Sequence, residues 1–316
     1  MAGFNFIALL LIAAASTMAT VTGPVINQDF PDPGIMSYGG VLYAFATNGN
    51  GYNIQVAQST NGGSAWTVLA KDALPNVGSW ATTGATWAPA PLSLGTNSFV
   101  LYYTATNPST GSHCVGAATA TTPTGPYTPR SSPIQCQQAG GGAIDPSPFR
   151  DTNGQLYIVF KVDGNNLGGG GSCGNGNLAY STPIMLQAMN ADGVTPNGNP
   201  VTILDRSAAD GPLIEAPGLV HIDGTYFLFF SSNCYNTNLY DTSYATATSV
   251  SGPYTKAQAP VAPFLLTGQF GLTSPGSASI LPDGSLIVFH ASTSLSPLIR
   301  PMYISHPTWT SSSVAP

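Results

Sequence analysis

The stretch Gly211-Pro-Leu-Ile-Glu-Ala-Pro-Gly-Leu-Val-His-Ile-Asp-Gly-Thr-Tyr-Phe-Leu-Phe-Phe-Ser-Ser232 contains the pattern that decides the fold. Near its start lies Glu215, the only glutamate in the chain. A turn signal at Asp223-Gly224 follows, and then a strand-forming run at 226–230. Asp-Gly between two apolar runs is typical of a β-hairpin, because both residues tolerate positive φ. The stretch therefore predicts a hairpin with one carboxylate at its entrance.

The same unit occurs five times along the 316 residues. In each copy a residue before proline is followed by a turn and a strand run; these runs lie at 42–47, 100–105, 156–161, 226–231 and 286–291. The runs start 58, 56, 70 and 60 residues apart. Four short strands at this period predict a propeller blade, so we expect an all-β, five-bladed β-propeller in a single domain. A β-sandwich or jelly roll with chance similarity between its hairpins is the alternative.

Further strands complete each predicted blade. Third strands are expected at 54–59, 113–120, 177–181, 243–250 and 300–305, and a fourth, outer strand is visible at 66–70. We expect the ring to close where the segment 21–27 pairs with the last strands near Trp309.

Composition limits the function classes. Only 6% of the residues are charged, and the formal net charge is -6. An acidic chain with few lysines cannot neutralise a phosphate backbone, which argues against a nucleic-acid partner. A neutral partner such as a sugar suits this surface.

The N-terminus resembles a secretion signal. Residues 6–15 form an apolar run of the length of a signal-peptide core, too short to span a membrane. We predict a signal peptide at 1–19, cleavage near Ala19, and a propeller at 20–316. No other segment is apolar enough to span a membrane, so we expect a secreted, extracellular monomer.

Four cysteines are present: Cys114, Cys136, Cys173 and Cys234. None forms a Cys-x-x-Cys pair, so a zinc site is not expected. An even number in a secreted chain predicts two disulfides, for which three pairings are possible. We prefer 114–136 and 173–234, because Cys173 and Cys234 fall in equivalent loops of adjacent blades.

The residues near each proline mark form a predicted ring around one face of the propeller, where the inner strands begin. The five ring positions are Asp32, Ala88, Asp145, Glu215 and Ser274. Three acids gathered at a channel mouth repel one another, and such an arrangement usually has a function. Asx-turn caps and a calcium site are alternatives, although no spaced Asp/Asn loop supports calcium.

Carboxylates that face a sugar-sized pit are what glycoside hydrolysis requires. One must be protonated to release the leaving oxygen, and another must stay ionised to activate water. A third can keep these two protonation states apart. From the residues alone, the roles of the two aspartates can be exchanged.

Five motifs give the chain a resemblance to glycoside hydrolase family 43: Phe30-Pro-Asp-Pro-Gly34, Thr86-Trp-Ala-Pro89, Ile144-Asp-Pro-Ser-Pro-Phe149, Gly211-Pro-Leu-Ile-Glu-Ala-Pro217 and Phe289-His-Ala291. They occur in order across about residues 25–305. The resemblance implies a five-bladed propeller that hydrolyses arabinose- and xylose-containing polysaccharides with inversion.

The resemblance also implies residue roles. It makes Asp32 the general base, Glu215 the general acid, and Asp145 the residue that orients the acid and keeps it protonated. A histidine at the place of His290 holds a central ion through water in this family, so a calcium or sodium ion in the channel is possible; no cofactor is required. The alternative for His290 is a core histidine.

Three further side chains are candidates for substrate binding. Trp87 and Phe30 can either stack on a sugar or pack in the core. Arg300 can hydrogen-bond sugar hydroxyls and hold the charge of the acids. The glycine-rich loop 162–176 is longer than the family pattern and should reshape the pocket.

We therefore expect a secreted α-L-arabinofuranosidase or arabinanase that acts on arabinose-containing plant cell-wall polysaccharide. The arabinose preference rests on the lack, in these 316 residues, of the C-terminal sandwich domain that xylosidases of the family often carry. A β-xylosidase and a non-catalytic carbohydrate-binding propeller are the alternatives. Exo or endo action stays open.

Overall fold

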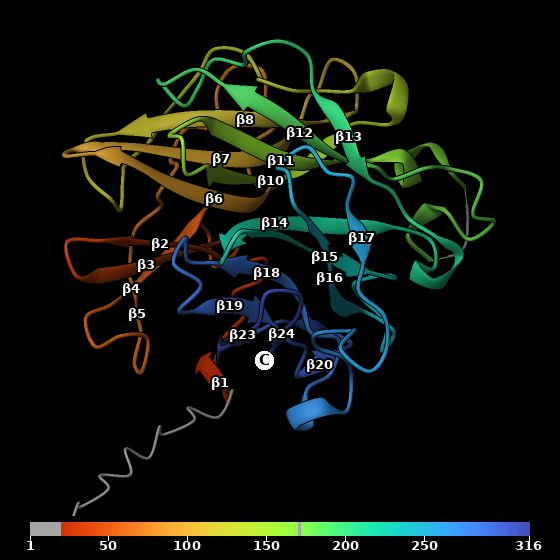
Figure 1. The fold of residues 1–316 in the computed structure, drawn as a ribbon. Helices are drawn as coiled ribbons and strands as arrows, with labels where there is room; N and C mark the ends of the chain where they lie inside the picture. The colour runs from red at the N-terminus through yellow and green to blue at the C-terminus, as the bar shows by residue number, and fades with distance from the viewer. Residues whose placement is uncertain (1–19, 170–171) are drawn as a thin grey trace, which may run out of the picture.

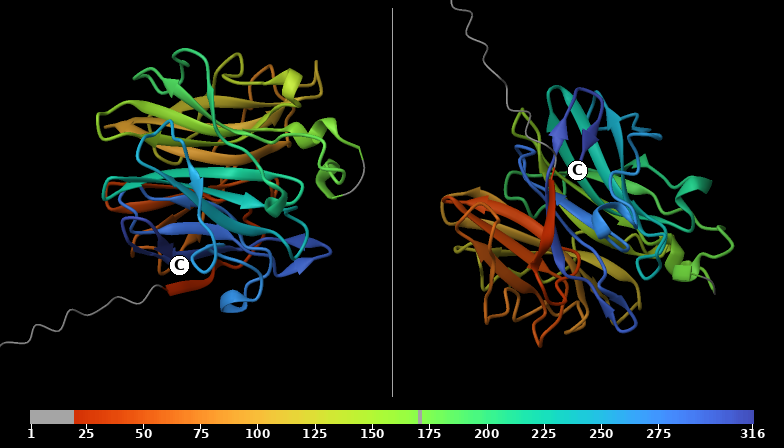
Figure 2. Two further views of the ribbon diagram at one scale, coloured as in Figure 1. Left: turned by 45° about the vertical axis from the view of Figure 1, so that its right-hand side comes forward. Right: turned by 90° about the horizontal axis from the view of Figure 1, so that it is seen from below.

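The computed structural model describes residues 20–169 and 172–316. Their strands form five four-stranded antiparallel sheets, and these sheets follow one another in chain order as the blades of a propeller. Figure 2 shows the same blades from two further sides. The all-β, five-bladed prediction is confirmed. The predicted signal peptide at 1–19 lies outside the described residues.

The strands of the first three blades are as follows. Blade 1 contains β2 (Gly34–Tyr38), β3 (Val41–Ala46), β4 (Gln55–Ser59) and β5 (Thr67–Val68). Blade 2 contains β6 (Thr86–Gly95), β7 (Ser98–Thr106), β8 (His113–Ala120) and β9 (Thr128–Pro129). Blade 3 contains β10 (Ala143–Arg150), β11 (Leu156–Val162), β12 (Ile184–Met189) and β13 (Val201–Leu204).

The last two blades and the minor elements complete the fold. Blade 4 contains β14 (Ile214–Ile222), β15 (Thr225–Ser232), β16 (Asp241–Ala247) and β17 (Thr255–Lys256). Blade 5 contains β18 (Gly276–Ile280), β19 (Ile287–His290), β22 (Met302–His306) and β1 (Thr20–Ile26). Two small hairpins pair β20 (Ser294–Leu295) with β21 (Leu298–Ile299) and β23 (Thr308–Trp309) with β24 (Val314–Ala315). The 3-10 helices are η1 (Gln138–Gly140), η2 (Gly164–Leu167), η3 (Ser172–Gly174), η4 (Ala208–Asp210) and η5 (Gln269–Gly271).

The N-terminal strand closes the ring. β1 pairs antiparallel with β22, so a strand from the start of the chain completes the last blade (Figure 1). The segment predicted for closure is therefore right, but its partner is β22, while Trp309 lies in the neighbouring hairpin. None of the helices in the described residues is long and apolar enough to cross a membrane.

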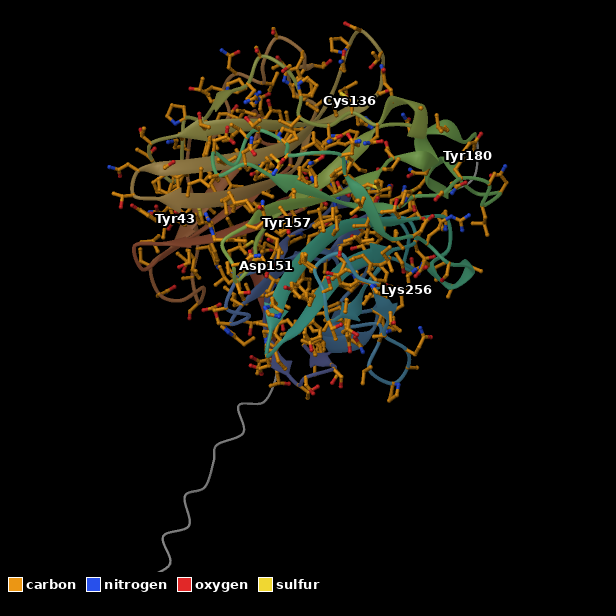
Figure 3. The ribbon with its side chains drawn as sticks, turned by 45° about the horizontal axis from the view of Figure 1, so that its top comes forward. Tyr43, Cys136, Asp151, Tyr157, Tyr180 and Lys256 are labelled. Atoms are coloured by element: carbon orange, nitrogen blue, oxygen red, sulfur yellow. A yellow bond between two sulfur atoms is a disulfide. The ribbon has the colours of Figure 1, made fainter. Side chains whose placement is uncertain are left out.

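One predicted strand is displaced. The third strand of blade 3 was expected at 177–181, but it is β12, at Ile184–Met189. Residues 177–181 instead form turns, because Asn175 and Arg206 hold the carbonyl of Tyr180 with hydrogen bonds from their side chains. Tyr180 lies at the right-hand edge in Figure 3, far from Asp151 at the end of β10.

Apolar side chains fill the space between neighbouring blades. The second strands of the blades read as continuous apolar runs because both of their faces meet another sheet; Phe227, Leu228, Phe229 and Phe230 of β15 are all buried. Phe30 belongs to the cluster between blades 5 and 1, and none of its surface is exposed. Of the two readings of Phe30, the structure supports the core residue.

We predict that Phe30→Ala lowers the free energy of unfolding by about 3–5 kcal/mol, because the change leaves a cavity in a closed core. Phe270→Ala is the matched control: Phe270 is 58% exposed, so its loss should change stability by no more than about 0.5 kcal/mol. Urea unfolding measures both. Equal stability of the two variants, with weaker sugar binding by Phe30→Ala, would contradict the core assignment.

Candidate active site

In each blade, the inner strand is preceded or interrupted by a residue in the left-handed region of backbone space at an equivalent position. These residues and their φ angles are Asp32 (53°), Ala88 (43°), Asp145 (56°), Ala216 (49°) and Ser277 (55°). In blades 2 to 5 the residue lies inside a β-bulge. In blade 5, Ser274 before the strand also has a positive φ of 49°. Positive φ at a non-glycine residue is strained, and such strain gathers at functional sites.

The turn directs the backbone N–H of each of these residues toward a side chain on the preceding blade. Four acceptors lie at 2.9–3.1 Å: His290 Nδ1 for Asp32, Thr47 Oγ1 for Ala88, Thr104 Oγ1 for Asp145 and Ser231 Oγ for Ser277. These acceptors lie at or just beyond the end of the second strand of their blade. Each blade is thus fastened to the next by one hydrogen bond near the channel.

The junction between blades 3 and 4 differs. The register places Lys161 where the other blades carry their acceptor, opposite Ile144. An ammonium group can only donate, so it cannot accept the N–H of Ala216. Asp145 Oδ2 accepts that N–H instead, at 2.9 Å. One carboxylate is thereby fixed beside the backbone that carries Glu215.

The structure corrects two of the five predicted ring positions. Glu215 precedes the left-handed residue, Ala216, by one position and pairs with Ser231. In blade 5 the equivalent residue is Ser277, whereas Ser274 lies before the strand and donates its hydroxyl to the carbonyl of Thr237. The two aspartates occupy equivalent positions, and Glu215 approaches the site from a different backbone position.

The groups around Asp32 favour its ionised form. Its carboxylate accepts hydrogen bonds from Thr47 Oγ1 at 2.8 Å and from Ser277 Oγ at 2.9 Å. Arg300 Nη1 lies 3.4 Å from both carboxylate oxygens of Asp32. Burial alone would raise the pKa of Asp32, but the Arg300 charge and these hydroxyl donors hold it below the ordinary value.

The pKa of Asp145, which lies beside Glu215, is shifted in the opposite direction. Burial, and next the nearby Glu215 carboxylate, raise the pKa of Asp145 well above its ordinary value, despite the Lys161 ammonium. Glu215 accepts hydrogen bonds from Lys161 Nζ at 3.1 Å and from the Tyr240 hydroxyl at 3.0 Å. Asp145 therefore keeps its proton at a pH where Asp32 is ionised.

Gly276 makes room for Tyr240. A Cβ atom on Gly276 would lie only 2.0 Å from a ring carbon of Tyr240. A side chain here would push the ring that donates to Glu215, so the glycine is needed for close approach.

Sequence reasoning missed a buried charge network behind the acids. Lys161 has no exposed surface and lies 3.5 Å from Asp163 Oδ1. Asp163 Oδ2 lies 2.9 Å from His113 Nδ1, and His113 packs on Trp87 with ring centroids 4.3 Å apart. His113 was not among the candidate site residues from the sequence. The sequence offered one indication of this network: Lys161 lies near the end of an otherwise apolar run, and a buried lysine needs an acidic partner.

The site residues surround a pocket of about 480 Å³. Asp32, Asp145, Glu215, Trp87 and Arg300, all candidates from the sequence, line it together. Phe30 does not line it. A larger hollow of about 700 Å³ lies where the inner strands end in their hairpin turns, and it contains none of the three carboxylates.

Two loops form one wall of the pocket. Gly168, Cys173 and Gly174 line it from the glycine-rich loop after β11, as predicted for that loop, and Tyr235 lines it from the loop after β15. Both loops lie at the right-hand side of the molecule in Figure 1. The Cys173–Cys234 disulfide joins them, and Cys114–Cys136 is the second disulfide; both pairings were predicted.

His290 lies in the wall of the channel, fully buried. Its burial lowers its pKa to about 3, so the ring is neutral. Because Nδ1 accepts the N–H of Asp32, the ring proton is on Nε2, which has no partner. Nε2–H can donate to a water but cannot bind an ion directly. The residues therefore fit a channel ion held through water, and the described chain contains no cluster of three or more metal-ligating side chains.

A propeller with three carboxyl groups in one pocket, two of them with pKa values shifted in opposite directions, has the parts of a glycoside hydrolase. The model of Glycosyl hydrolases family 43 matches residues 21–313. The chain belongs to this family.

Individual relatives are distant. A β-D-galactofuranosidase of Aspergillus niger is 26% identical over 303 residues, covering 89% of this chain and 79% of that protein. A Xylanibacter ruminicola protein named "Putative beta-xylosidase" is 26% identical over 211 residues, covering 66% of this chain and 33% of that protein. This match therefore spans only about a third of the Xylanibacter relative. The crystal structure of a thermostable family-43 glycoside hydrolase has the same fold, with a TM-score of 0.75 at 24% identity over 94% of this chain and 95% of that one.

We predict that Lys161→Met destabilises the protein by about 3–5 kcal/mol at pH 7, because it leaves buried carboxylates without their cation. The loss should be smaller at pH 5, where the freed carboxyl groups take up protons more readily. Lys256→Met is the control, since Lys256 pairs with Asp210 in a partly exposed position and should cost about 1 kcal/mol or less. Denaturant unfolding of both variants at the two pH values provides the measurement. A loss for Lys161→Met that does not depend on pH would contradict the assigned network.

Proposed function

We propose that this protein is a secreted, inverting O-glycoside hydrolase that cleaves α-L-arabinofuranosidic bonds in plant cell-wall polysaccharide. One observation carries the proposal: one pocket holds Asp32, whose pKa is lowered, together with Glu215 and the neighbouring Asp145, whose pKa is raised. Inverting hydrolysis needs this contrast between a base and an acid.

In this mechanism Glu215 is the general acid that protonates the leaving oxygen. Asp32 is the general base that takes a proton from the attacking water, and Arg300 keeps it ionised between turnovers. Asp145 opposes loss of the proton from Glu215 and holds the backbone N–H of Ala216, which fixes the direction of Glu215. The low pKa of Asp32 and the raised pKa of Asp145 support this choice between the two aspartates, whose roles the residues alone left open.

The preference for a furanose is supported by the Aspergillus niger relative, whose name describes it as a β-D-galactofuranosidase. Arabinofuranose and galactofuranose share a five-membered ring. The name of the Xylanibacter relative favours the alternative, a β-xylosidase. Secretion is supported by the two disulfides, which persist in oxidising compartments.

The test is hydrolysis of 4-nitrophenyl α-L-arabinofuranoside, the matching β-D-xyloside and linear arabinan, with NMR identifying the first anomer released. We expect turnover of the arabinosides with inverted product, and a loss of at least about 10²-fold in kcat for Glu215→Ala. Asp151→Asn is the control, because Asp151 lies outside this pocket, where it accepts a hydrogen bond from Tyr226. Turnover of the xyloside alone would select the xylosidase. Binding of arabinan without turnover would indicate a non-catalytic propeller.

We also predict a broad pH profile of kcat/KM. The pKa of the acid limb should lie below the ordinary range of an aspartate, since the enzyme loses activity only when Asp32 becomes protonated. The alkaline limb should lie well above the ordinary carboxyl range, where the carboxyl groups of Asp145 and Glu215 have lost their protons.

Asp145→Asn should move the alkaline limb to lower pH by about one unit or more, because a neighbouring negative charge no longer opposes loss of the proton. The acid limb should move less. An unchanged alkaline limb in Asp145→Asn, with kcat reduced, would show that Asp145 does not control the proton.

A further inference from the structure

We infer that Tyr235 forms a second sugar-binding position in the pocket, next to the position of the sugar whose bond is cleaved. This inference rests on the proposed function. It predicts a substrate that places two adjacent sugars in the pocket, the second of them stacked on an aromatic ring supplied by the loop after β15.

Tyr235 has the exposure that a binding residue needs. Its side chain is 39% exposed although it lines the pocket together with the three carboxylates. One part of its ring faces Arg300, whose guanidinium carbon lies 5.3 Å from the ring centroid. An aromatic ring placed this way offers its remaining surface to an apolar sugar face, and such contacts add to the area that binding buries.

The pocket has room for more than one sugar. Its volume of about 480 Å³ falls in the range of about 300–1,000 Å³ that holds drug-sized ligands. A single pentose ring is smaller than such ligands. Trp87 and Tyr235 line the pocket from different blades, blade 2 and blade 4. Two aromatic walls suit two sugar rings.

The Cys173–Cys234 disulfide holds Tyr235 in place. Tyr235 follows Cys234 directly, and the disulfide ties this loop to the pocket wall of blade 3. On the other side of Tyr235, the carbonyl of Thr237 accepts a hydrogen bond from Ser274 Oγ at 2.8 Å. A loop fixed on both sides of an exposed aromatic residue lowers the entropy that the residue loses on binding.

Tyr235 could instead act only through Arg300, by keeping that guanidinium beside Asp32. The two roles differ in what they change. Loss of a sugar contact weakens ligands that have a second sugar, whereas loss of Arg300 positioning affects all ligands alike and moves the acid limb of the pH profile.

The experiment measures dissociation constants by calorimetry on Glu215→Gln, which holds ligands without turning them over. The ligands are α-1,5-arabinobiose, xylobiose and the methyl glycosides of both sugars. Adding Tyr235→Ala should weaken disaccharide binding about ten-fold, and at least five-fold more than methyl glycoside binding. Tyr235→Phe should restore the ratio of the two affinities, because it keeps the ring.

The two disulfides provide a matched pair of variants. Cys173→Ser with Cys234→Ser should reproduce the Tyr235→Ala ratio, whereas Cys114→Ser with Cys136→Ser should leave the wild-type ratio. Equal weakening of disaccharide and methyl glycoside by Tyr235→Ala would overturn the inference, as would failure of Glu215→Gln to bind either disaccharide. Two results together would support the inference and reject the proposed arabinose specificity: xylobiose binding depends on Tyr235, and the wild type turns over no arabinoside.

Discussion

A left-handed turn near the start of each inner strand directs one backbone N–H toward the preceding blade, and the site depends on how that N–H is satisfied. At four junctions a threonine, serine or histidine accepts it. At the fifth, Lys161 occupies the acceptor position and Asp145 accepts the N–H instead. The change that brings in a buried cation thus also fixes a carboxylate beside Glu215.

The protein pays for this arrangement in stability. Buried ion pairs rarely stabilise a fold beyond what apolar residues of similar size would contribute, and three carboxyl groups around one channel repel one another. The surrounding groups shift the pKa values of Asp32 and Asp145 in opposite directions. Arg300 and two hydroxyl donors keep Asp32 charged, while burial and the nearby Glu215 carboxylate keep a proton on Asp145. Such a difference in pKa is what separates a base from an acid at one pH.

Most of the fold was predictable from the sequence because the second strand of each blade is buried on both faces and follows a turn signal. The two aspartates were also predictable, since each precedes a proline at the same point of its repeat. Bulges in the inner strands limited the rest of the prediction. Spacing from the proline selected Ser274 where the structure has Ser277, and it gave Glu215 the backbone position that Ala216 occupies.

Partners contributed by other blades were the second obstacle. Lys161 meets Glu215 from 54 positions away, and Ser277 meets Asp32 from 245 positions away. No local pattern encodes such contacts. Phe30 was misjudged for a related reason: it lies in the same motif as Asp32, but it packs in the core between the first and last blades.

The central claim is that Asp145, beside Glu215, keeps its proton at a pH where Asp32 is ionised. Carbon-detected NMR titration of the side-chain carboxyl groups, with Asp145→Asn to assign the Asp145 signal, tests it directly. The account predicts that Asp145 titrates well above the ordinary range of about 4, while Asp32 titrates below it. Ionisation of Asp145 below about pH 5 would contradict it.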